Sequence, residues 1–180
     1  LEKYTYQTPE RFGCVGDGIT NDTENLQRAI DYCASHNEYL FLQKKYRVST
    51  VTLTSRLVMF GVFVGNYSDD VTPQIICSSG ILAKDNVYVE GVVFASASNN
   101  DVLIIDGARS KFSRLTIANG NHGIYIGSTS NSNNCNSYYD ITILNCSTAI
   151  EIANNNSSDS QCQYFMNVDI RGCLNGIVSI

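Results

Sequence analysis

A repeat of short apolar runs constrains this sequence more than any other feature. Four runs that read EGVVFAS, SRLTIAN, YDITILN and MNVDIRG begin at Glu90, Ser113, Tyr139 and Met166. A second set, DVLI, GIYI, AIEI and GIVS, begins at Asp101, Gly123, Ala149 and Gly176. Both sets recur with a period of roughly 25 residues, and no helical pattern lies between the runs. Such a period with several strands per repeat is typical of a parallel β-helix, in which each turn of chain stacks on the one before.

Alignment of the first set brings like residues into columns that predict the inward face of the coil. Neighbouring residues of a strand point to opposite faces, so two apolar columns two positions apart face the core together. These columns are Val92, Leu115, Ile141 and Val168, and Phe94, Ile117, Ile143 and Ile170. An interior aromatic column is predicted from Val89, Phe112, Tyr138 and Phe165. The column between the apolar ones, Val93, Thr116, Thr142 and Asp169, is expected to face outward.

The same alignment stacks cysteines and asparagines on successive turns. Cys135 falls over Cys162 and Cys146 over Cys173, both pairs at the same offset. Adjacent strands lie about 4.8 Å apart, a separation that a disulfide can bridge. We favour a ladder of reduced, buried thiols over disulfides, because β-helix interiors stack like residues. Asn119 over Asn145 similarly predicts a short amide ladder at a turn.

One amphipathic helix is expected before the strands, over residues 21–37. Leu26, Ala29, Ile30 and Cys33 have the i, i+3, i+4, i+7 spacing of an apolar helical face. Asn21 is the expected N-cap, with Glu24 three residues later as in a capping box. The open first turn of a β-helix needs a cover, and this helix is placed to supply it.

The motif GDGITND at residues 16–22 introduces the helix. It has neither the glycine register of a dinucleotide cradle nor the ligand spacing of a calcium loop. We expect Gly16 and Gly18 to adopt positive φ and Asp17 and Asp22 to accept hydrogen bonds from turn amides.

This opening, FGCVGDGITNDTENLQRAIDYC followed by YLFLQKKYRV, resembles the start of pectate-lyase-like β-helix domains of phage tailspikes and related polysaccharide-degrading enzymes. Those domains begin with a pattern of the type G-A-x-G-D-G-x-x-D-D-T and then A-x-Q-x-A-I. The resemblance implies an all-β, right-handed, single-stranded parallel β-helix with an N-terminal amphipathic capping helix. It also implies a homotrimer in the parent protein and a bacterial cell-surface polysaccharide as the partner.

We therefore expect residues 1–180 to form one β-helix domain, with an entry segment over 1–20, the capping helix over 21–37 and coils over 38–180. Because the chain stops within an apolar run, GIVSI, we expect it to be the N-terminal portion of a longer protein.

The composition argues against several classes of partner and cofactor. The net charge is −5 and the longest basic run is Lys44–Lys45, so no nucleic-acid partner is expected. No apolar stretch approaches the roughly 20 residues of a membrane span, and no membrane partner is expected. Seven cysteines without CxxC pairs and two isolated histidines predict no metal site, and no cofactor is expected.

Candidate site residues follow from the outward positions of the coils. Glycoside hydrolysis needs two carboxylates, and outward positions on stacked turns recur at useful separations. The candidate catalytic acids are Glu151, Asp169 and Asp140, and the candidate substrate-binding residues are Tyr125, Thr116, Thr142 and Arg114. Glu151 is predicted to lie over Tyr125, and Asp169 over Thr142. Asp140 shares a column with Arg114, so an ion pair between them is the alternative to catalysis. His122 is interpreted as a turn residue.

The leading functional hypothesis is a tailspike-like protein that recognises and degrades bacterial surface polysaccharide, either as a hydrolase or as a lyase that works by β-elimination. A non-catalytic glycan-binding adhesin or structural spike is one alternative, and a pectinolytic cell-wall enzyme is another. The expected location is the virion for a tailspike and outside the cell otherwise.

Overall fold

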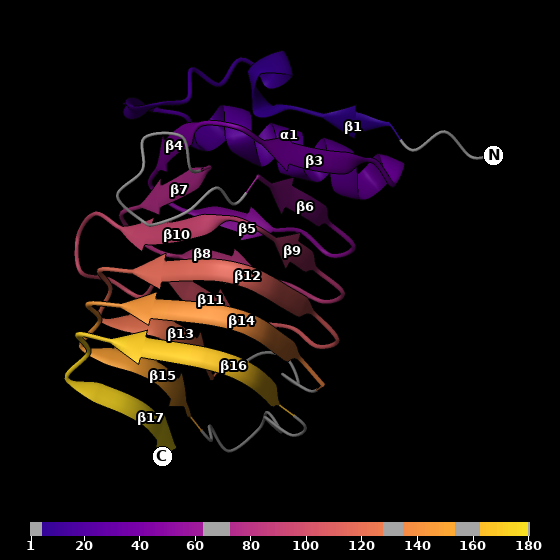
Figure 1. Ribbon diagram of the computed structural model, residues 1–180. Helices are drawn as coiled ribbons and strands as arrows, with labels where there is room; N and C mark the ends of the chain where they lie inside the picture. Colours follow the sequence, from indigo (N-terminus) through magenta and orange to yellow (C-terminus); the bar gives the residue numbers. More distant parts are fainter. Residues whose placement is uncertain (1–4, 63–72, 128–134, 154–162, 180) are drawn as a thin grey trace.

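The computed structural model describes residues 5–62, 73–127, 135–153 and 163–179, which form a single stack of β-strand turns (Figure 1). Every strand pair in this part of the chain is parallel. The helix α1 (Thr23–His36) lies across the N-terminal end of the stack. The predicted all-β parallel β-helix with one capping helix is confirmed.

The strands form two sheets, here called sheet A and sheet B. Sheet A joins eleven described strands: β1 (Tyr6–Gln7), β2 (Asp17–Asn21), β3 (Tyr39–Leu42), β4 (Lys45–Val48), β6 (Val58–Gly61), β7 (Gln74–Cys77), β9 (Tyr88–Glu90), β10 (Val93–Ser96), β12 (Lys111–Ala118), β14 (Ser137–Leu144) and β16 (Tyr164–Arg171). Sheet B joins six: β5 (Val51–Leu53), β8 (Ile81–Ala83), β11 (Leu103–Ile105), β13 (His122–Ile126), β15 (Thr148–Ile152) and β17 (Asn175–Ser179).

A bend divides sheet A into two arms. The first part of β12 pairs with β9 and the second part with β10. Between the two parts Arg114 has a φ of +51°, and the equivalent residues Asp140 and Asn167 both have +54°. A left-handed residue turns the chain sharply, so the long strands fold around a corner. The coil therefore has three outer faces: the first arm (β1, β3, β6, β9), the second arm (β2, β4, β7, β10) and sheet B.

The predicted core columns of sheet A are confirmed. Leu115 pairs with Ile141, which pairs with Val168, and Ile117 aligns with Phe94 and Ile143. The aromatic column is also present: the ring centroids of Phe112 and Tyr138 are 5.5 Å apart, and those of Tyr138 and Phe165 are 4.5 Å apart. Burial of each such side chain stabilises the fold by about 1.5–3 kcal/mol.

The predicted alignment of one strand in sheet B is wrong by one residue. Leu103 lies beside Ile124, so Val102, and not Asp101, lies level with Gly123. A shift of one residue exchanges the faces of a strand. Asp101 consequently stands level with His122 on the outside of the coil, whereas the alignments of β13 with β15 and of β15 with β17 are as predicted.

The helix covers the first turn with apolar and polar contacts. Leu26, Ala29, Ile30 and Cys33 are fully buried, as their spacing predicts. The Gln27 side chain also bonds the edge strand of sheet B: its Nε2 donates to the Thr52 carbonyl at 3.0 Å, and its Oε1 accepts from the Thr52 amide at 2.8 Å. The side-chain amide thus takes the place of a neighbouring strand.

The entry motif has the predicted glycines but a different cap. Gly16 and Gly18 have φ values of +68° and +75°. The N-cap is Asp22, and the expectation of Asn21 is wrong. Asp22 is 1% exposed, and its carboxylate accepts from the amides of Val15 at 2.8 Å and Gly16 at 3.0 Å. Residues 17–21 also form β2 beside β4, so the motif contributes a strand as well as a turn.

The stack of Cys146 and Cys173 agrees with the predicted thiol ladder. The Cys146 amide lies 3.4 Å from Cys173 Sγ, and both thiols are free. Burial raises the pKa of Cys146 to about 11, so its thiol is neutral at pH 7. Cys135 is a free, exposed thiol instead of a buried one, and its predicted neighbour Cys162 lies outside the described residues. Asn119 and Asn145 both have positive φ at equivalent turns, but a bond between their amides stays a prediction.

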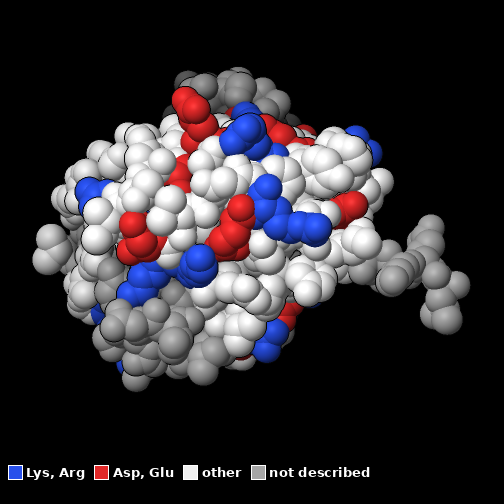
Figure 2. Space-filling view, turned by 90° about the horizontal axis from the view of Figure 1, so that it is seen from above, with Lys and Arg blue, Asp and Glu red and all other residues white. Residues whose placement is uncertain are grey.

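Two further observations concern membrane-spanning helices and the distribution of surface charge. In the part of the chain that the structure describes, no helix has the length and apolar character to cross a membrane. The view onto the helix-covered end shows acidic and basic side chains interspersed over the surface (Figure 2). No large field of one sign gathers on this visible face.

Candidate functional site

Three ionisable side chains meet on the outside of sheet B. His122 Nδ1 lies 2.7 Å from Asp101 Oδ1, and His122 Nε2 lies 3.0 Å from Glu151 Oε2. The side chains are 18%, 29% and 16% exposed for His122, Asp101 and Glu151, so each is accessible to solvent yet held by neighbours. We call these three residues the acid–histidine cluster.

The stacking of turns positions this cluster. Asp101 precedes β11, His122 opens β13 and Glu151 lies within β15, so the three residues come from three successive turns. The Val102 amide donates to the His122 carbonyl at 2.9 Å, which fixes Asp101 and His122 at the same level. Glu151 lies directly beside Tyr125 on the outer face. The Tyr125 ring is 5.4 Å from the His122 ring, centroid to centroid.

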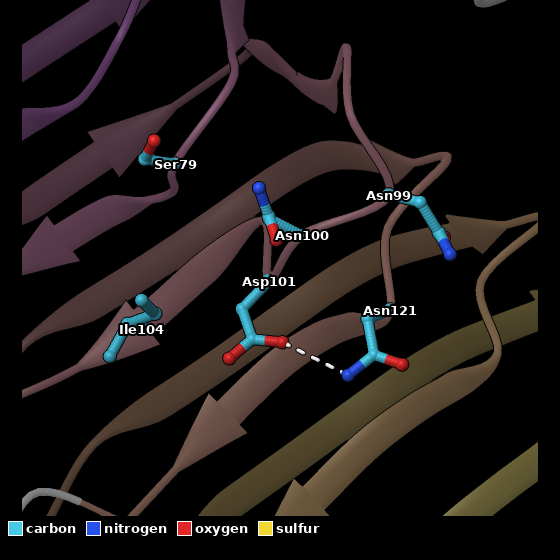
Figure 3. Close-up of a pocket in the computed structure, with 6 residues that line it drawn as sticks. All are labelled: Ser79, Asn99, Asn100, Asp101, Ile104 and Asn121. Carbon is cyan, nitrogen blue, oxygen red and sulfur yellow. Dashed lines mark hydrogen bonds between the residues drawn. The ribbon is translucent and has the colours of Figure 1, made fainter.

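A polar pocket borders the cluster. It has a volume of about 550 Å³ and is lined by Ser79, Asn99, Asn100, Asp101, Ile104 and Asn121 (Figure 3). Asn121 Nδ2 donates to Asp101 Oδ1 at 3.4 Å, and this amide also lies 3.2 Å from His122 Nδ1. Hydroxyl and amide groups around one apolar side chain suit a sugar, which presents hydroxyls at its rim and C–H bonds on its faces.

The geometry defines what the cluster can do. The two carboxylates contact opposite nitrogens of one imidazole, so the ring and its two contacts separate them. The carboxylates of inverting glycosidases are separated by about 6.5–9.5 Å, and those of retaining enzymes by about 5 Å. Among the described residues, no group of three or more metal-ligating side chains is arranged to hold an ion. In the cluster itself, the imidazole stands between the two acids.

The structure joins two of the predicted site residues and separates the others from them. Glu151 and Tyr125 lie together, as predicted. Thr116, Thr142 and Asp169 are aligned on the second arm of sheet A and not on sheet B. Thr116 is 4% exposed, which leaves little of it for a ligand, and Asp169 forms an ion pair with Arg171.

The expected ion pair of Asp140 with Arg114 is replaced by other partners. Arg114 forms an ion pair with Glu90 of the preceding turn, while Asp140 Oδ1 accepts from Asn167 Nδ2 at 2.9 Å. Both Arg114 and Asp140 occupy the corner of sheet A, away from the acid–histidine cluster on sheet B. Their roles in catalysis or binding stay predictions.

Sequence reasoning missed Asp101 and His122 as partners of Glu151. The one-residue shift in the predicted register placed Asp101 over Gly123, so Asp101 was not expected beside His122. The available signal was the spacing from DVLI at Asp101 to GIYI at Gly123, which is shorter than the spacings between the later runs of that set. Alignment of Leu103 with Ile124 brings an acid beside the histidine.

Comparisons with known proteins agree with this fold. No protein-family model matches the chain. The chain is 39% identical over 57 residues to a capsule K30/K69-specific depolymerase of Klebsiella phage K64-1, a match that covers 32% of this chain and 7% of the depolymerase. A solved structure of a candidate glycosyl hydrolase from Parabacteroides merdae is similar with a TM-score of 0.62 and 11% identity, covering 92% of this chain and 96% of that chain.

The structure of ORF18 from Geobacillus virus E2 is similar at a TM-score of 0.49 and 16% identity, over 91% of this chain and 48% of the viral one. The glycosyl hydrolase comparison supports the β-helix fold, and the depolymerase comparison supports the relation to phage proteins. The predicted resemblance to β-helix proteins of the phage tailspike type is therefore confirmed.

Proposed function

We propose that the chain is part of a phage protein that binds and hydrolyses a bacterial surface polysaccharide at the acid–histidine cluster. The observation that carries this proposal is the contact of Asp101 and Glu151 with opposite nitrogens of His122, beside a polar pocket. The similarity to a phage capsule depolymerase over 57 residues supports a polysaccharide as the substrate. A trimeric parent and a place in the virion belong to the same proposal.

Each member of the cluster has a role in this reaction. One carboxylic acid protonates the glycosidic oxygen as the bond breaks, and the other carboxylate takes a proton from the attacking water. After the reaction the first group lacks a proton and the second has gained one. His122 contacts both, so its imidazole can return the proton and restore the starting state.

The charge of the site favours hydrolysis over β-elimination. A lyase neutralises the uronate of its substrate with a cation, and the charged residue lining the described pocket is Asp101. Two carboxylates repel a uronate whether His122 is neutral or protonated. We therefore propose a neutral sugar at the cleavage position.

The test is incubation of the protein with a panel of bacterial capsular and O-antigen polysaccharides, with new reducing ends as the measurement. Glu151→Gln and Asp101→Asn should each lower the rate by about 10²-fold or more, because neither amide transfers protons. The unsaturated product of a lyase absorbs ultraviolet light, and hydrolysis produces no such absorbance. The matched control is Glu24→Gln, which removes an exposed carboxylate from α1.

The same assay tests the remaining candidate acids. A large loss in Asp169→Asn or Asp140→Asn, together with full activity in Glu151→Gln, would move the proposed site to sheet A. Polysaccharide binding without any new reducing ends, across the panel, would favour the non-catalytic adhesin.

A further inference from the structure

A line of five aromatic rings and one lysine follows the first arm of sheet A on its outer face. The line, here called the aromatic stripe, consists of Tyr39, Phe60, Tyr88, Lys111, Tyr139 and Tyr164. Its residues lie on β3, β6, β9, β12, β14 and β16, which are stacked one above another (Figure 1). Each of these strands thus contributes one member. The acid–histidine cluster lies on sheet B, a different face of the coil.

The rings contact one another from turn to turn. The Phe60 ring centroid is 5.5 Å from that of Tyr39 and 5.6 Å from that of Tyr88. The ring centroids of Tyr139 and Tyr164 are likewise 5.6 Å apart. An apolar hollow of about 330 Å³, lined by Tyr6, Tyr39, Phe41 and Phe60, extends the stripe toward the N-terminal end.

Lys111 gives the centre of the stripe a positive charge. Its Nζ lies 5.4 Å from the Tyr88 ring centroid and 5.3 Å from the Tyr139 ring centroid, so two cation–π contacts hold it. The side chain is exposed, and no ion pair of Lys111 is present among the residues that the structure describes. An ammonium held in this way keeps its N–H donors for an anion.

Glu90, on the strand beside Lys111, does not repel an anion strongly, because its charge is already paired. Glu90 is paired with Arg114 and also accepts a hydrogen bond from the Tyr88 hydroxyl. The side chains level with Lys111 and Tyr139 on adjacent strands include Ser137 and Ser113, which are hydrogen-bonding groups rather than apolar ones. The surface around Lys111 therefore combines flat rings, hydroxyls and one positive charge.

We propose that the aromatic stripe is a second, non-catalytic binding track for an anionic, uronate-bearing polysaccharide chain. Sugar rings stack on Tyr88, Tyr139 and Tyr164, and a carboxylate binds Lys111. The turns repeat about every 4.8 Å, close to the size of one sugar ring, so successive sugars of an extended chain can meet successive turns. The two surfaces differ in charge. Lys111 of the stripe attracts a uronate, whereas the carboxylates of the acid–histidine cluster repel it.

The glycan nature of the ligand rests on the proposed function, but binding at the stripe is measured without any cleavage. The probe is alginate, an anionic polymer of uronates, with dextran as the neutral comparison, each cast into a native gel. The protein should be retarded by alginate several-fold more than by dextran, and added salt should weaken the retardation because the attraction is ionic.

Substitutions in the aromatic stripe test whether alginate binds there. Lys111→Gln should weaken binding to alginate about fivefold or more, because it removes the charge and both cation–π contacts. Tyr88→Leu and Tyr139→Leu keep apolar bulk on the strand but lose the flat ring, and should weaken it by a similar factor. Arg47→Gln, which removes an exposed charge from β4 on the other arm, is the matched control and should bind as the wild type does.

Three results would overturn the proposal: no retardation by alginate, equal retardation of the Lys111 variant and the wild type, or a change in molar mass of the tyrosine variants by light scattering. The last would mean that a second copy of the chain covers the stripe. Glu151→Gln should bind alginate normally, so failure of the stripe and failure of the catalytic cluster give separate results.

Discussion

At the scale of single residues, two aspartates of the entry motif have different surroundings. Asp22 is buried and accepts hydrogen bonds from the amides of Val15 and Gly16. Asp17 is exposed and accepts from the amides of Thr20 at 2.7 Å and Ile19 at 2.8 Å. These bonds from Thr20 and Ile19 hold the pKa of Asp17 below its ordinary value. The contribution of Asp17 to stability is therefore present at neutral pH and lost as the pH falls through its lowered pKa.

Asp22→Ala should destabilise the protein by about 1–3 kcal/mol, because two partly buried amides lose their charge-assisted partner, the buried Asp22 carboxylate. Urea denaturation measures the change. Asp17→Ala is the matched control, since water can reach the amides that it exposes, and its effect should be much smaller. Equal losses in the two variants would contradict a special role for the buried carboxylate.

At the scale of elements, the cap works through a side chain that imitates a strand. The edge of β5 would otherwise present the unpaired amide and carbonyl of Thr52, and Gln27 bonds both. An open edge of this kind is a template for pairing with another chain. The apolar face of α1 supplies the remaining cover.

Gln27→Met keeps the length and helix propensity of the side chain but removes its hydrogen-bonding groups. We expect a loss of about 1–3 kcal/mol in the free energy of unfolding, and small oligomers that elute earlier than the wild type at high protein concentration. Thermal denaturation and size-exclusion chromatography test these expectations. Glu24→Met, on the exposed side of the same helix, should leave both measurements near wild type.

At the scale of the whole molecule, one continuous core runs through the turns. Leu40 beneath the helix and Ile143 far along the chain belong to the same cluster of buried side chains. Ile143 is fully buried, while the preceding residue, Thr142, points outward and is half-buried. Each turn therefore relies on the turns beside it to cover its apolar face.

Ile143→Ala should cost about 2–4 kcal/mol through the cavity it leaves, and Ile143→Asp should prevent folding because an unpaired carboxylate would lie in the core. Thr142→Ala, the matched control, should change stability by less than about 1 kcal/mol. Urea denaturation measures the alanine variants. A well-folded Ile143→Asp variant, detected by circular dichroism, would contradict the observed register.

Most of the fold could be predicted from the sequence because its columns repeat. Leu115, Ile141 and Val168 recur with a period that only a stacked coil explains, and the helix has an unbroken apolar face. The active-site candidate was less predictable, because Asp101 precedes its strand and depends on a register set by only three paired positions. The aromatic stripe was missed for another reason: its members are divided between two outward columns, so no single column contains them all.

The stacking of turns also determines which changes in chain length the acid–histidine cluster can tolerate. Asp101, His122 and Glu151 each come from a different turn, and the hydrogen bonds between turns set their heights. An insertion in a connection between strands leaves these hydrogen bonds in place, so it alters what surrounds the cluster but not the spacing of its members. Loss of a whole turn instead removes one member and shifts the others past each other. On such a scaffold, the connections can vary in length and sequence while the number of turns across the cluster stays constant.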